Sequence, residues 1–279
     1  MSRRWRLDVA YRGTGLHGFA DQPGLDTVAG RLADALTRTC RLTERPRLVC
    51  AGRTDAGVHA LAQVIHVDLP DPLPIRRGAP LDAAGLCRSL NRQLNPAISV
   101  RAAQAVAADF DARYDATARR YRYLLEVGPT PDPLLSDVAW QVEGSLDVAA
   151  MRAAALTLLG THDFRSFCRR APGSSPLEPI CRRVLDARIV ELDRPSGEWP
   201  GSALYGVELE ANAFCHHMVR SVVGQLVEVG RGHQSQADFY ERLLLADRHG
   251  AADPAPAKGL CLIAVRYGEA SSADPTGPR

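Results

Sequence analysis

The sequence predicts an α+β fold in which one order of elements, β-α-β-β-α-β, occurs twice along 279 residues. Two observations predict it. Short runs in which apolar and polar residues alternate are typical of half-buried strands, and longer runs with apolar residues at helical spacing lie between them. Stretches rich in Gly and Pro separate these runs, as connecting loops do.

The first half contains two helix patterns and four strand patterns. Thr27 is suited to cap the first helix, in which Val28, Leu32 and Leu36 recur at helical spacing. The second helix is expected over 82–94, with Leu86 and Leu90 on one face. The four strands are expected at 5–11, 48–49, 63–69 and 98–102.

The second half repeats this order of elements without an evident repeat of residues. Strands are expected at 119–127, 184–192, 204–211 and 260–267, and helices at 146–159, 214–229 and 236–246. Two such units predict a pair of ferredoxin-like halves with mainly antiparallel sheets. We expect an N-terminal half over 1–107, a C-terminal half over 108–268, and a Ser/Pro/Gly-rich disordered tail over 269–279.

Composition limits the class of protein. The chain is 46% hydrophobic and 24% charged, and no run approaches the ~20 apolar residues of a membrane helix. The first residues enter a strand pattern directly, so we expect no signal peptide, no membrane partner and a cytoplasmic location. Lys258 is the only lysine, so the cations are almost all arginines, which suit bidentate contacts to phosphate.

Seven cysteines are present, and no two of them have C-x-x-C spacing. An odd number without that spacing argues against a disulfide framework or a thiolate zinc site. We expect most of them to be small buried apolar residues.

The stretch 50–59 carries the strongest candidate for chemistry, because it joins two strand patterns and brackets Arg53 and Asp55 between Gly52 and Gly57. Asp55 is the candidate nucleophile, acid or base, and Arg53 is a candidate partner for a phosphate or for Asp55. An ordinary connecting loop, with Asp as a turn former, is the alternative interpretation.

Two further stretches combine aromatic and basic residues. In the strand pattern at 119–127, alternation puts Tyr121 and Tyr123 on one face and Arg120 and Arg122 on the other, as base stacking and phosphate binding require. A core strand with half-buried tyrosines and solvated arginines is the alternative.

The second stretch contains His216, His217 and Arg220, and we expect it on the helix at 214–229. Adjacent side chains on a helix project about 100° apart, so a metal ion shared by these histidines is geometrically poor. We therefore expect no metal site, and either a basic surface facing RNA or an ion pair between Arg220 and a carboxylate.

Three long motifs carry a resemblance: A-G-R-T-D-A-G-V-H at 51–59, A-T-A-R-R-Y-R-Y at 116–123 and A-N-A-F-C-H-H-M-V-R at 211–220, followed by G-L-C-L at 259–262. With these motifs the chain resembles the tRNA pseudouridine synthase A family over residues 5–267. The resemblance implies the pseudouridine synthase fold and an RNA-modifying isomerase. Its expected substrates are uridines 38, 39 and 40 of the tRNA anticodon stem-loop, without cofactor or metal and without a DNA partner, and its expected assembly is a homodimer.

The resemblance also implies a role for each matching residue. Asp55 is the catalytic nucleophile, and Arg220 pairs with it. Tyr121 packs on the target base, Arg53 takes part in RNA binding and base flipping, and Leu260 lines the pocket. The sequence departs from the family at Arg12, where an aspartate is usual, and reads Gly18-Phe-Ala where Gly-Trp-Gln is usual. This departure concerns a loop expected to contact tRNA.

Attack of the aspartate on C1′ and addition at C6 both agree with these residues, and we favour attack on C1′. Two other functions use the same features. One is a non-catalytic ferredoxin-like RNA-binding protein, against which the joint presence of Asp55, Tyr121 and Arg220 argues. The other is a base-exchange transferase or nucleoside hydrolase, which would release free base.

Overall fold

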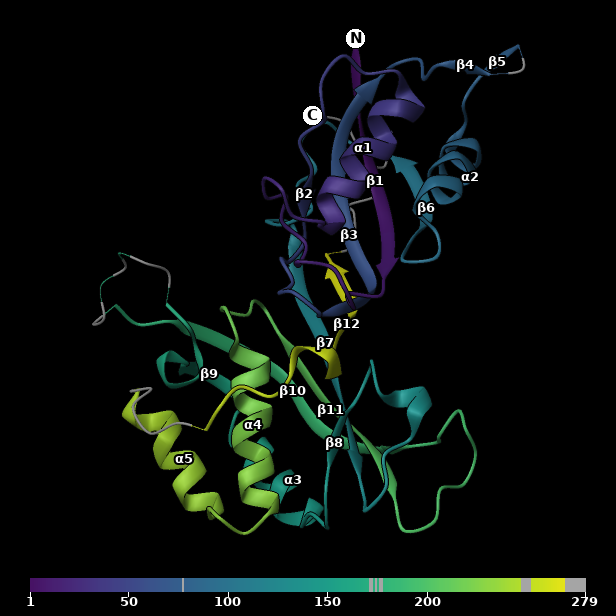
Figure 1. Ribbon diagram of the computed structural model, residues 1–279. Helices are drawn as coiled ribbons and strands as arrows, with labels where there is room; N and C mark the ends of the chain where they lie inside the picture. Colours follow the sequence, from purple (N-terminus) through teal and green to yellow (C-terminus); the bar gives the residue numbers. More distant parts are fainter. Residues whose placement is uncertain (77, 171–172, 174, 176–177, 247–251, 269–279) are drawn as a thin grey trace, which may run out of the picture.

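The computed structural model describes residues 1–76, 78–170, 173, 175, 178–246 and 252–268; the tail expected at 269–279 lies outside them. A single ten-stranded sheet in the order β6-β1-β3-β12-β7-β11-β10-β9 runs through the molecule, with β2 added to β3 and β8 added to β7. All but two of its strand pairs are antiparallel. Figure 1 shows an upper and a lower part that this sheet connects. The predicted α+β class with a mostly antiparallel sheet is confirmed.

The upper part contains strands β1, β2, β3 and β6, two helices and a separate hairpin. Thr27 and Asp82 cap the two helices, each accepting from the main-chain N–H of the third residue on, as expected for Thr27. Both helices bury a leucine stripe, which includes Leu32, Leu36 and Leu90. The bounds are β1 Ser2–Tyr11, α1 Val28–Cys40, β2 Val49–Cys50, β3 His59–Pro70, β4 Ile75–Arg76, β5 Ala79–Pro80, α2 Ala83–Leu94 and β6 Ile98–Ala105.

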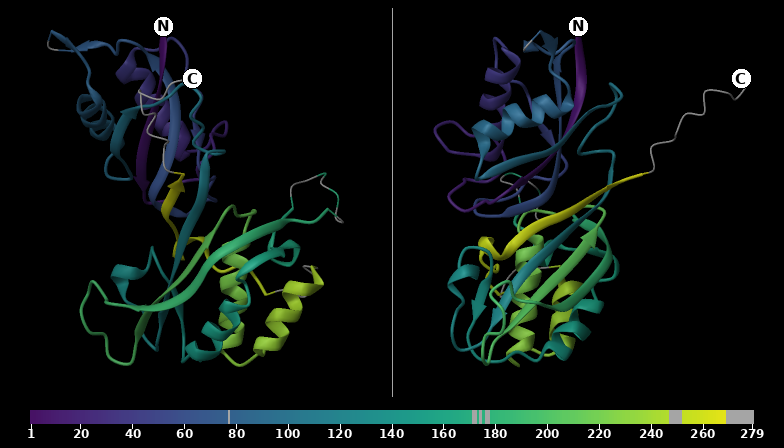
Figure 2. Two further views of the ribbon diagram at one scale, coloured as in Figure 1. Left: turned by 180° about the vertical axis from the view of Figure 1, so that it is seen from behind. Right: turned by 90° about the vertical axis from the view of Figure 1, so that its right-hand side faces the viewer.

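The lower part packs three helices on one face of the sheet. Figure 1 shows α3, α4 and α5 in front of the strands, and the view from behind shows the strands in front of the helices (Figure 2). The bounds are β7 Ala116–Val127, β8 Trp140–Val142, α3 Val148–Leu156, β9 Gly160–Asp163, β10 Cys181–Leu192, β11 Ala203–Ala211, α4 Met218–Gly230, α5 Gln236–Leu245 and β12 Leu260–Tyr267. None of the described helices is long and apolar enough to cross a membrane.

The last strand joins the two parts. β12 pairs antiparallel with β7 and makes a short parallel pair with β3, in which Cys261 is opposite His59 and Leu262 is opposite Ala60. One buried apolar cluster accordingly includes residues of both parts. No pattern in the sequence predicts this junction, because alternation within a strand does not identify its neighbours.

Two helix predictions need correction at their ends. The helix expected over 214–229 begins only at Met218, because His217 adopts a left-handed conformation with φ +66°. The helix expected over 146–159 spans only Val148–Leu156. Strand β9 follows it from Gly160, whose φ of +101° permits the change of direction.

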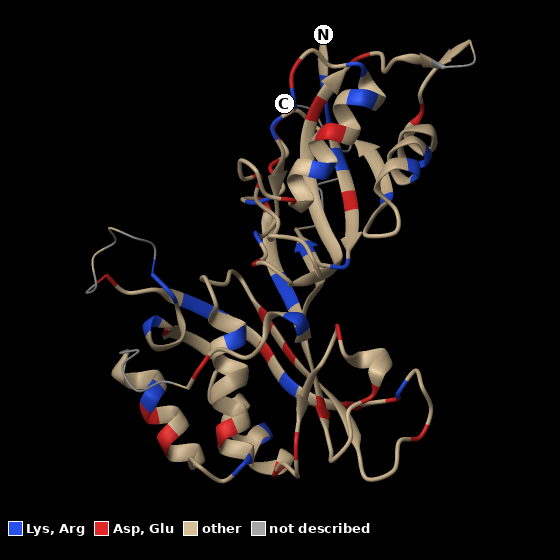
Figure 3. Cartoon of the chain, in the orientation of Figure 1, with Lys and Arg blue, Asp and Glu red and all other residues tan. Residues whose placement is uncertain are grey.

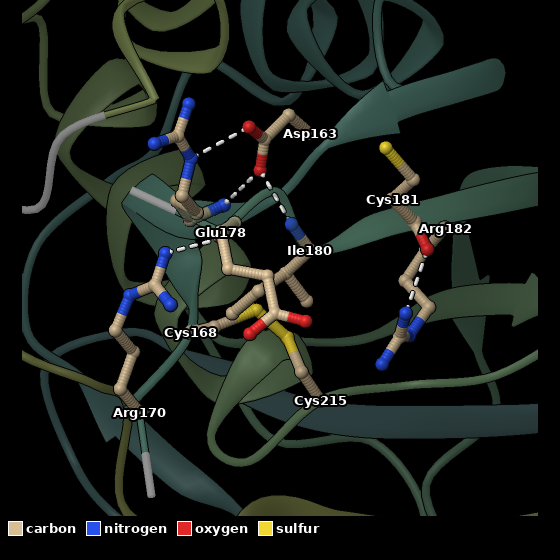
Figure 4. The surroundings of a disulfide bond; sticks show 9 residues. Asp163, Cys168, Arg170, Glu178, Ile180, Cys181, Arg182 and Cys215 are labelled. Carbon is tan, nitrogen blue, oxygen red and sulfur yellow. Dashed lines mark hydrogen bonds and ion pairs between the residues drawn. A yellow bond between two sulfur atoms is a disulfide. The ribbon is translucent and has the colours of Figure 1, made fainter. Parts of the chain in front are cut away.

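The cysteines depart from expectation at one pair. Cys168 and Cys215 form a disulfide across 47 residues, between the loop after β9 and the turn before α4 (Figure 4). The cysteine spacing did not predict this bond. Disulfide pairing depends on proximity in the tertiary structure, which spacing in the sequence does not report. Of the others, Cys40 and Cys50 are buried, Cys87 and Cys261 are half-buried and Cys181 is exposed.

The sheet face opposite the lower helices carries ion pairs. Glu208 on β11 is 2% exposed and accepts hydrogen bonds from Arg120 and Arg122 on β7 and from Arg188 on β10. Acidic and basic residues lie near one another on these strands (Figure 3). Arg120 and Arg122 thus lie on the face opposite Tyr121 and Tyr123, as predicted, but they bind carboxylates.

Candidate active site

The loop that holds Asp55 packs tightly against the loop that follows β1. A Cβ atom on Gly13 would lie 2.1 Å from the carbonyl oxygen of Val58. One on Gly18 would lie 2.8 Å from the carbonyl oxygen of Thr54. Both approaches require glycine, so the main chain on either side of Asp55 is fixed by direct backbone contact.

Buried polar side chains hold the same loop from β1 and β3. The hydroxyls of Tyr11 and Thr54 are 2.8 Å apart. The amide of Gln63 donates to the carbonyl oxygen of Gly52 over 2.7 Å and to the hydroxyl of Tyr11 over 3.3 Å. These bonds satisfy polar groups that would be costly to bury alone, and they fix the main chain on the N-terminal side of Asp55.

The carboxylate of Asp55 is 28% exposed and meets three nitrogen-bearing side chains. Nη1 of Arg220 and Nε2 of His217 lie 3.3 and 3.5 Å from Oδ2, and Nε2 of His216 lies 3.3 Å from Oδ1. A guanidinium at this distance can hold the carboxylate in one orientation, which a nucleophile or base requires.

Arg220 is held in place by the segment that precedes β12. Its Nε donates to the carbonyl oxygen of Ala255 over 2.7 Å, and the N–H of Ala255 donates to the carbonyl oxygen of Arg220 over 3.0 Å. A Cβ on Gly224, one turn further along α4, would lie 2.3 Å from the carbonyl oxygen of Asp253. Glycine at 224 therefore allows residues 253–255 to approach the helix and orient Arg220.

His216 and His217 lie in the turn before α4 and not on the helix. The N–H of Met218 donates to the carbonyl oxygen of Cys215 over 3.1 Å, and the N–H of Arg169 donates to that of His216 over 2.8 Å. The left-handed conformation of His217 lets both imidazoles reach Asp55. Sequence reasoning missed these contacts because it placed the pair on a regular helix.

Tyr121 lies on β7, with its side chain 7% exposed, and packs edge-on against Phe214 with ring centroids 5.1 Å apart. Its hydroxyl is close to Gly52, where an added Cβ would lie 3.5 Å away. Burial raises the pKa of Tyr121 well above its ordinary value of 10, so its hydroxyl stays protonated at neutral pH.

Leu260 begins β12, is 6% exposed and is paired with Tyr123 across the strands. The main chain at Gly259, just before Leu260, packs directly against the ring of Tyr123. A Cβ atom on Gly259 would lie 2.5 Å from that ring. The hydroxyl of Tyr123 donates to the carbonyl oxygen of Pro256 over 2.7 Å. Tyr123 thus anchors the entry to β12, whereas Tyr121 lies beside the Asp55 loop.

Arg53 is exposed, two residues before Asp55. Among the described residues, no carboxylate forms an ion pair with Arg53, and no residue forms a hydrogen bond with its side chain. Of the two partners considered for Arg53, a phosphate or Asp55, Asp55 does not pair with it among these residues, and Arg220 lies beside Asp55. The guanidinium of Arg53 faces solvent, where a phosphate can reach it.

Two buried side chains, Arg119 and His59, connect the Asp55 loop to the lower part. The sequence analysis assigned a role to neither of them. Arg119 on β7 donates to the carbonyl oxygens of Ala51 over 2.9 Å and of Asn212 over 2.8 Å. Nε2 of His59 lies 2.9 Å from the carbonyl oxygen of Lys258, and burial lowers the pKa of His59, which favours the neutral ring. Arg119, Tyr121 and Tyr123 are two residues apart along β7 and therefore share one face of the strand. The strand pattern alone could have predicted that Arg119 points inward.

A family profile described as tRNA pseudouridine synthase matches residues 154–268, which include Arg220 and Leu260. The tRNA pseudouridine synthase A of Frankia casuarinae is 43% identical over 95% of this chain and 89% of its own length. Those of Cutibacterium acnes and Bifidobacterium animalis subsp. lactis are 40% and 37% identical over 95% of this chain, and 88% and 93% of their own lengths.

The fold and these relatives define the class of protein: an RNA-modifying isomerase of α+β architecture. The chain belongs to the tRNA pseudouridine synthase A family. It converts uridine to pseudouridine in tRNA.

Proposed function

We propose that the chain acts on uridines 38, 39 and 40 of the tRNA anticodon stem-loop, with Asp55 as nucleophile. The observation that supports this most is the convergence of side chains from three distant elements. Asp55 comes from the β2–β3 loop, Arg220 from the first turn of α4, and Tyr121 from β7 beside Gly52. A carboxylate, its guanidinium partner and an aromatic ring are the groups that base exchange on a sugar requires.

The reaction needs no net oxidation or reduction. The carboxylate of Asp55 attacks C1′ of the target uridine, and the electrons of the broken N1–C1′ bond leave with the uracil ring. The ring turns, C5 attacks C1′, and Asp55 departs as carboxylate. The hydrogen on C5 is then lost as a proton. Arg220 holds the carboxylate of Asp55 in position for the attack and stabilises it electrostatically when it departs at the end.

The target base must leave the stack before Asp55 can reach its sugar. The largely buried ring of Tyr121 lies beside the Asp55 loop, and Leu260 contributes an apolar wall at the start of β12. Arg53 faces solvent, and its guanidinium is available to a phosphate beside the flipped nucleotide. We assign stacking to Tyr121, pocket lining to Leu260, and RNA binding and base flipping to Arg53.

The finer organisation is also a proposal. We infer two ferredoxin-like halves with their boundary near residue 107, supported by the order β1-α1-β2-β3-α2-β6 before it and by the helix pair α3–α4 on one sheet face after it. A homodimer in the cytoplasm is supported by the resemblance of the motifs to the family and by the tRNA substrate.

Tritium release tests the proposed site and the nucleophile together. Anticodon stem-loop transcripts, each with one C5-tritiated uridine at position 38, 39 or 40, are incubated with purified protein. We expect release from all three, because joining C5 to the sugar expels that hydrogen. Asp55→Asn should reduce release by more than about a thousandfold while keeping tRNA affinity within severalfold.

Other outcomes identify the alternatives. Release within tenfold of wild type from Asp55→Asn would remove the nucleophile role. Free uracil in place of pseudouridine would indicate a nucleoside hydrolase or base-exchange transferase. Tight binding without release from any transcript would indicate a non-catalytic RNA-binding protein, and release only from uridines outside positions 38–40 would move the substrate site elsewhere in tRNA.

A further inference from the structure

Asp55, His216 and His217 form a cluster that the proposed reaction does not use in full. Nε2 of His216 is 3.3 Å from Oδ1 of Asp55, and Nε2 of His217 is 3.5 Å from Oδ2. The ligand atoms of the three residues all lie within 4.8 Å of one another. In the part of the chain that the structure describes, no other group of three His, Cys, Asp or Glu side chains converges in this way.

These distances match a metal coordination shell. Zinc bound by nitrogen and oxygen at roughly 2.0–2.2 Å in a tetrahedron has ligands about 3.4 Å apart. The distance from Nε2 of His216 to Oδ1 of Asp55, 3.3 Å, is close to that value, and one ligand atom from each of the three residues lies within 4.8 Å of the other two. The objection that adjacent histidines on a helix diverge does not apply, because both precede α4 and His217 has φ +66°.

The donor set selects the kind of ion. Two imidazoles and one carboxylate suit zinc and its neighbours among the first-row transition metals, whereas magnesium and calcium take oxygen ligands almost exclusively. His216 is 48% exposed, so the cluster opens to solvent on that side and leaves a fourth position for water. Arg220 contacts Oδ2 of Asp55, which leaves Oδ1 to bind the ion.

We propose that Asp55, His216 and His217 bind a zinc-class divalent ion, and that the bound ion inhibits the enzyme by occupying its nucleophile. A carboxylate that donates an electron pair to zinc is no longer available to attack carbon. The ion would also fill the space that the target sugar must enter. The binding part stands on the geometry alone, and the inhibition part rests on the proposed role of Asp55.

Binding is tested first, without tRNA, by titrating the metal-free protein with zinc and, in parallel, with cobalt(II). We expect one site, and a cobalt spectrum of nitrogen and oxygen ligands without a thiolate charge-transfer band. His216→Gln and Asp55→Asn should each weaken zinc binding tenfold or more. Cys181→Ser, which removes the exposed thiol of the neighbouring strand β10 (Figure 4), should leave it unchanged.

Inhibition is tested by tritium release from stem-loop RNA at increasing zinc. Wild-type activity should fall in step with site occupancy and return when a chelator is added. His216→Gln should need at least tenfold more zinc to lose half of its own uninhibited rate. A thermal melt of each variant checks that it is folded, and His217→Asn supplies a second variant if His216→Gln fails to fold.

Each contrary result has a distinct meaning. Zinc binding that is unchanged in the Asp55 and His216 variants, or lost in Cys181→Ser, overturns the site. Zinc bound at the site with activity intact overturns inhibition, and tells against Asp55 as nucleophile. Tritium release by the metal-free enzyme remains the separate test of the proposed function.

Discussion

Asp55 illustrates how single residues in this protein depend on side chains far away in sequence. Arg220, 165 residues further along, lies 3.3 Å from its carboxylate. At this distance the guanidinium orients the carboxylate that we propose as nucleophile. Tyr121 and Arg53 have different roles beside it, and each role gives a measurable expectation.

The substitution Tyr121→Phe should reduce the rate of the reaction only mildly. Burial keeps the hydroxyl protonated at neutral pH, so it cannot act as a base, and phenylalanine keeps the ring. We expect the rate of tritium release to stay within about tenfold of wild type. Tyr121→Ala, which also removes the ring, is the matched control and should lose far more. A collapse of the rate in Tyr121→Phe would mean that the hydroxyl transfers a proton.

Arg53→Ala should slow turnover on a paired stem more than it weakens tRNA binding. Arg53 is exposed two residues before Asp55, the proposed nucleophile, and its guanidinium can contact the RNA backbone. Arg88→Ala, which removes an exposed arginine of α2, is the control and should behave as wild type. The measurement is single-turnover tritium release with binding followed separately. An unchanged rate with weaker binding would make Arg53 a simple phosphate contact.

At the scale of elements, the turn before α4 and the segment before β12 together decide the geometry of the site. The turn directs His216 and His217 at Asp55, and the segment 253–255 holds Arg220 through two hydrogen bonds. Both are irregular, so they follow from contacts with neighbouring elements and not from local propensity.

Gly224→Ala tests the second of these segments. Alanine in place of glycine stabilises a helix by about 1 kcal/mol. Against this, the new Cβ would lie 2.3 Å from a main-chain oxygen of Asp253, an overpacking that costs about 1–3 kcal/mol. We expect lower stability in urea and a reduced kcat, because residues 253–255 must move and release Arg220. Equal or higher stability with full activity would show that the close approach is dispensable.

At the scale of the whole molecule, one continuous sheet and one apolar core unite the two parts through β12. The open face of the lower sheet is stabilised by charge. Glu208 is buried, and three arginines surround it. Burial alone would raise the pKa of Glu208, but hydrogen bonds from Arg188 and Arg122 outweigh it and hold the pKa below the ordinary value of 4.5.

Glu208→Gln should destabilise the fold by about 3 kcal/mol at pH 7, because it leaves the arginines without their shared carboxylate. Since the folded pKa is lowered, this stabilisation is fully present above pH 4.5 and is lost as the pH falls through the folded value. Urea unfolding of both proteins from pH 7 to pH 3 measures it. A difference that stays constant down to pH 3 would contradict the assignment.

Most of the helices and strands, and the identity of the candidate residues, can be predicted from local patterns in the sequence. Leucine stripes and the cap at Thr27 are local patterns, and the long motifs around Asp55, Tyr121 and Arg220 carry chemistry in their residue types. Local patterns predict local structure because helix and strand periods are properties of neighbouring residues.

How these residues come together in space depends on the tertiary structure. It placed β12 between the two parts, directed the arginines of β7 to Glu208, paired Cys168 with Cys215, and moved His216 and His217 off the helix toward Asp55. Each of these depends on contacts between segments far apart in the chain. Such contacts are set by packing and by the satisfaction of buried polar groups, which no sequence period records.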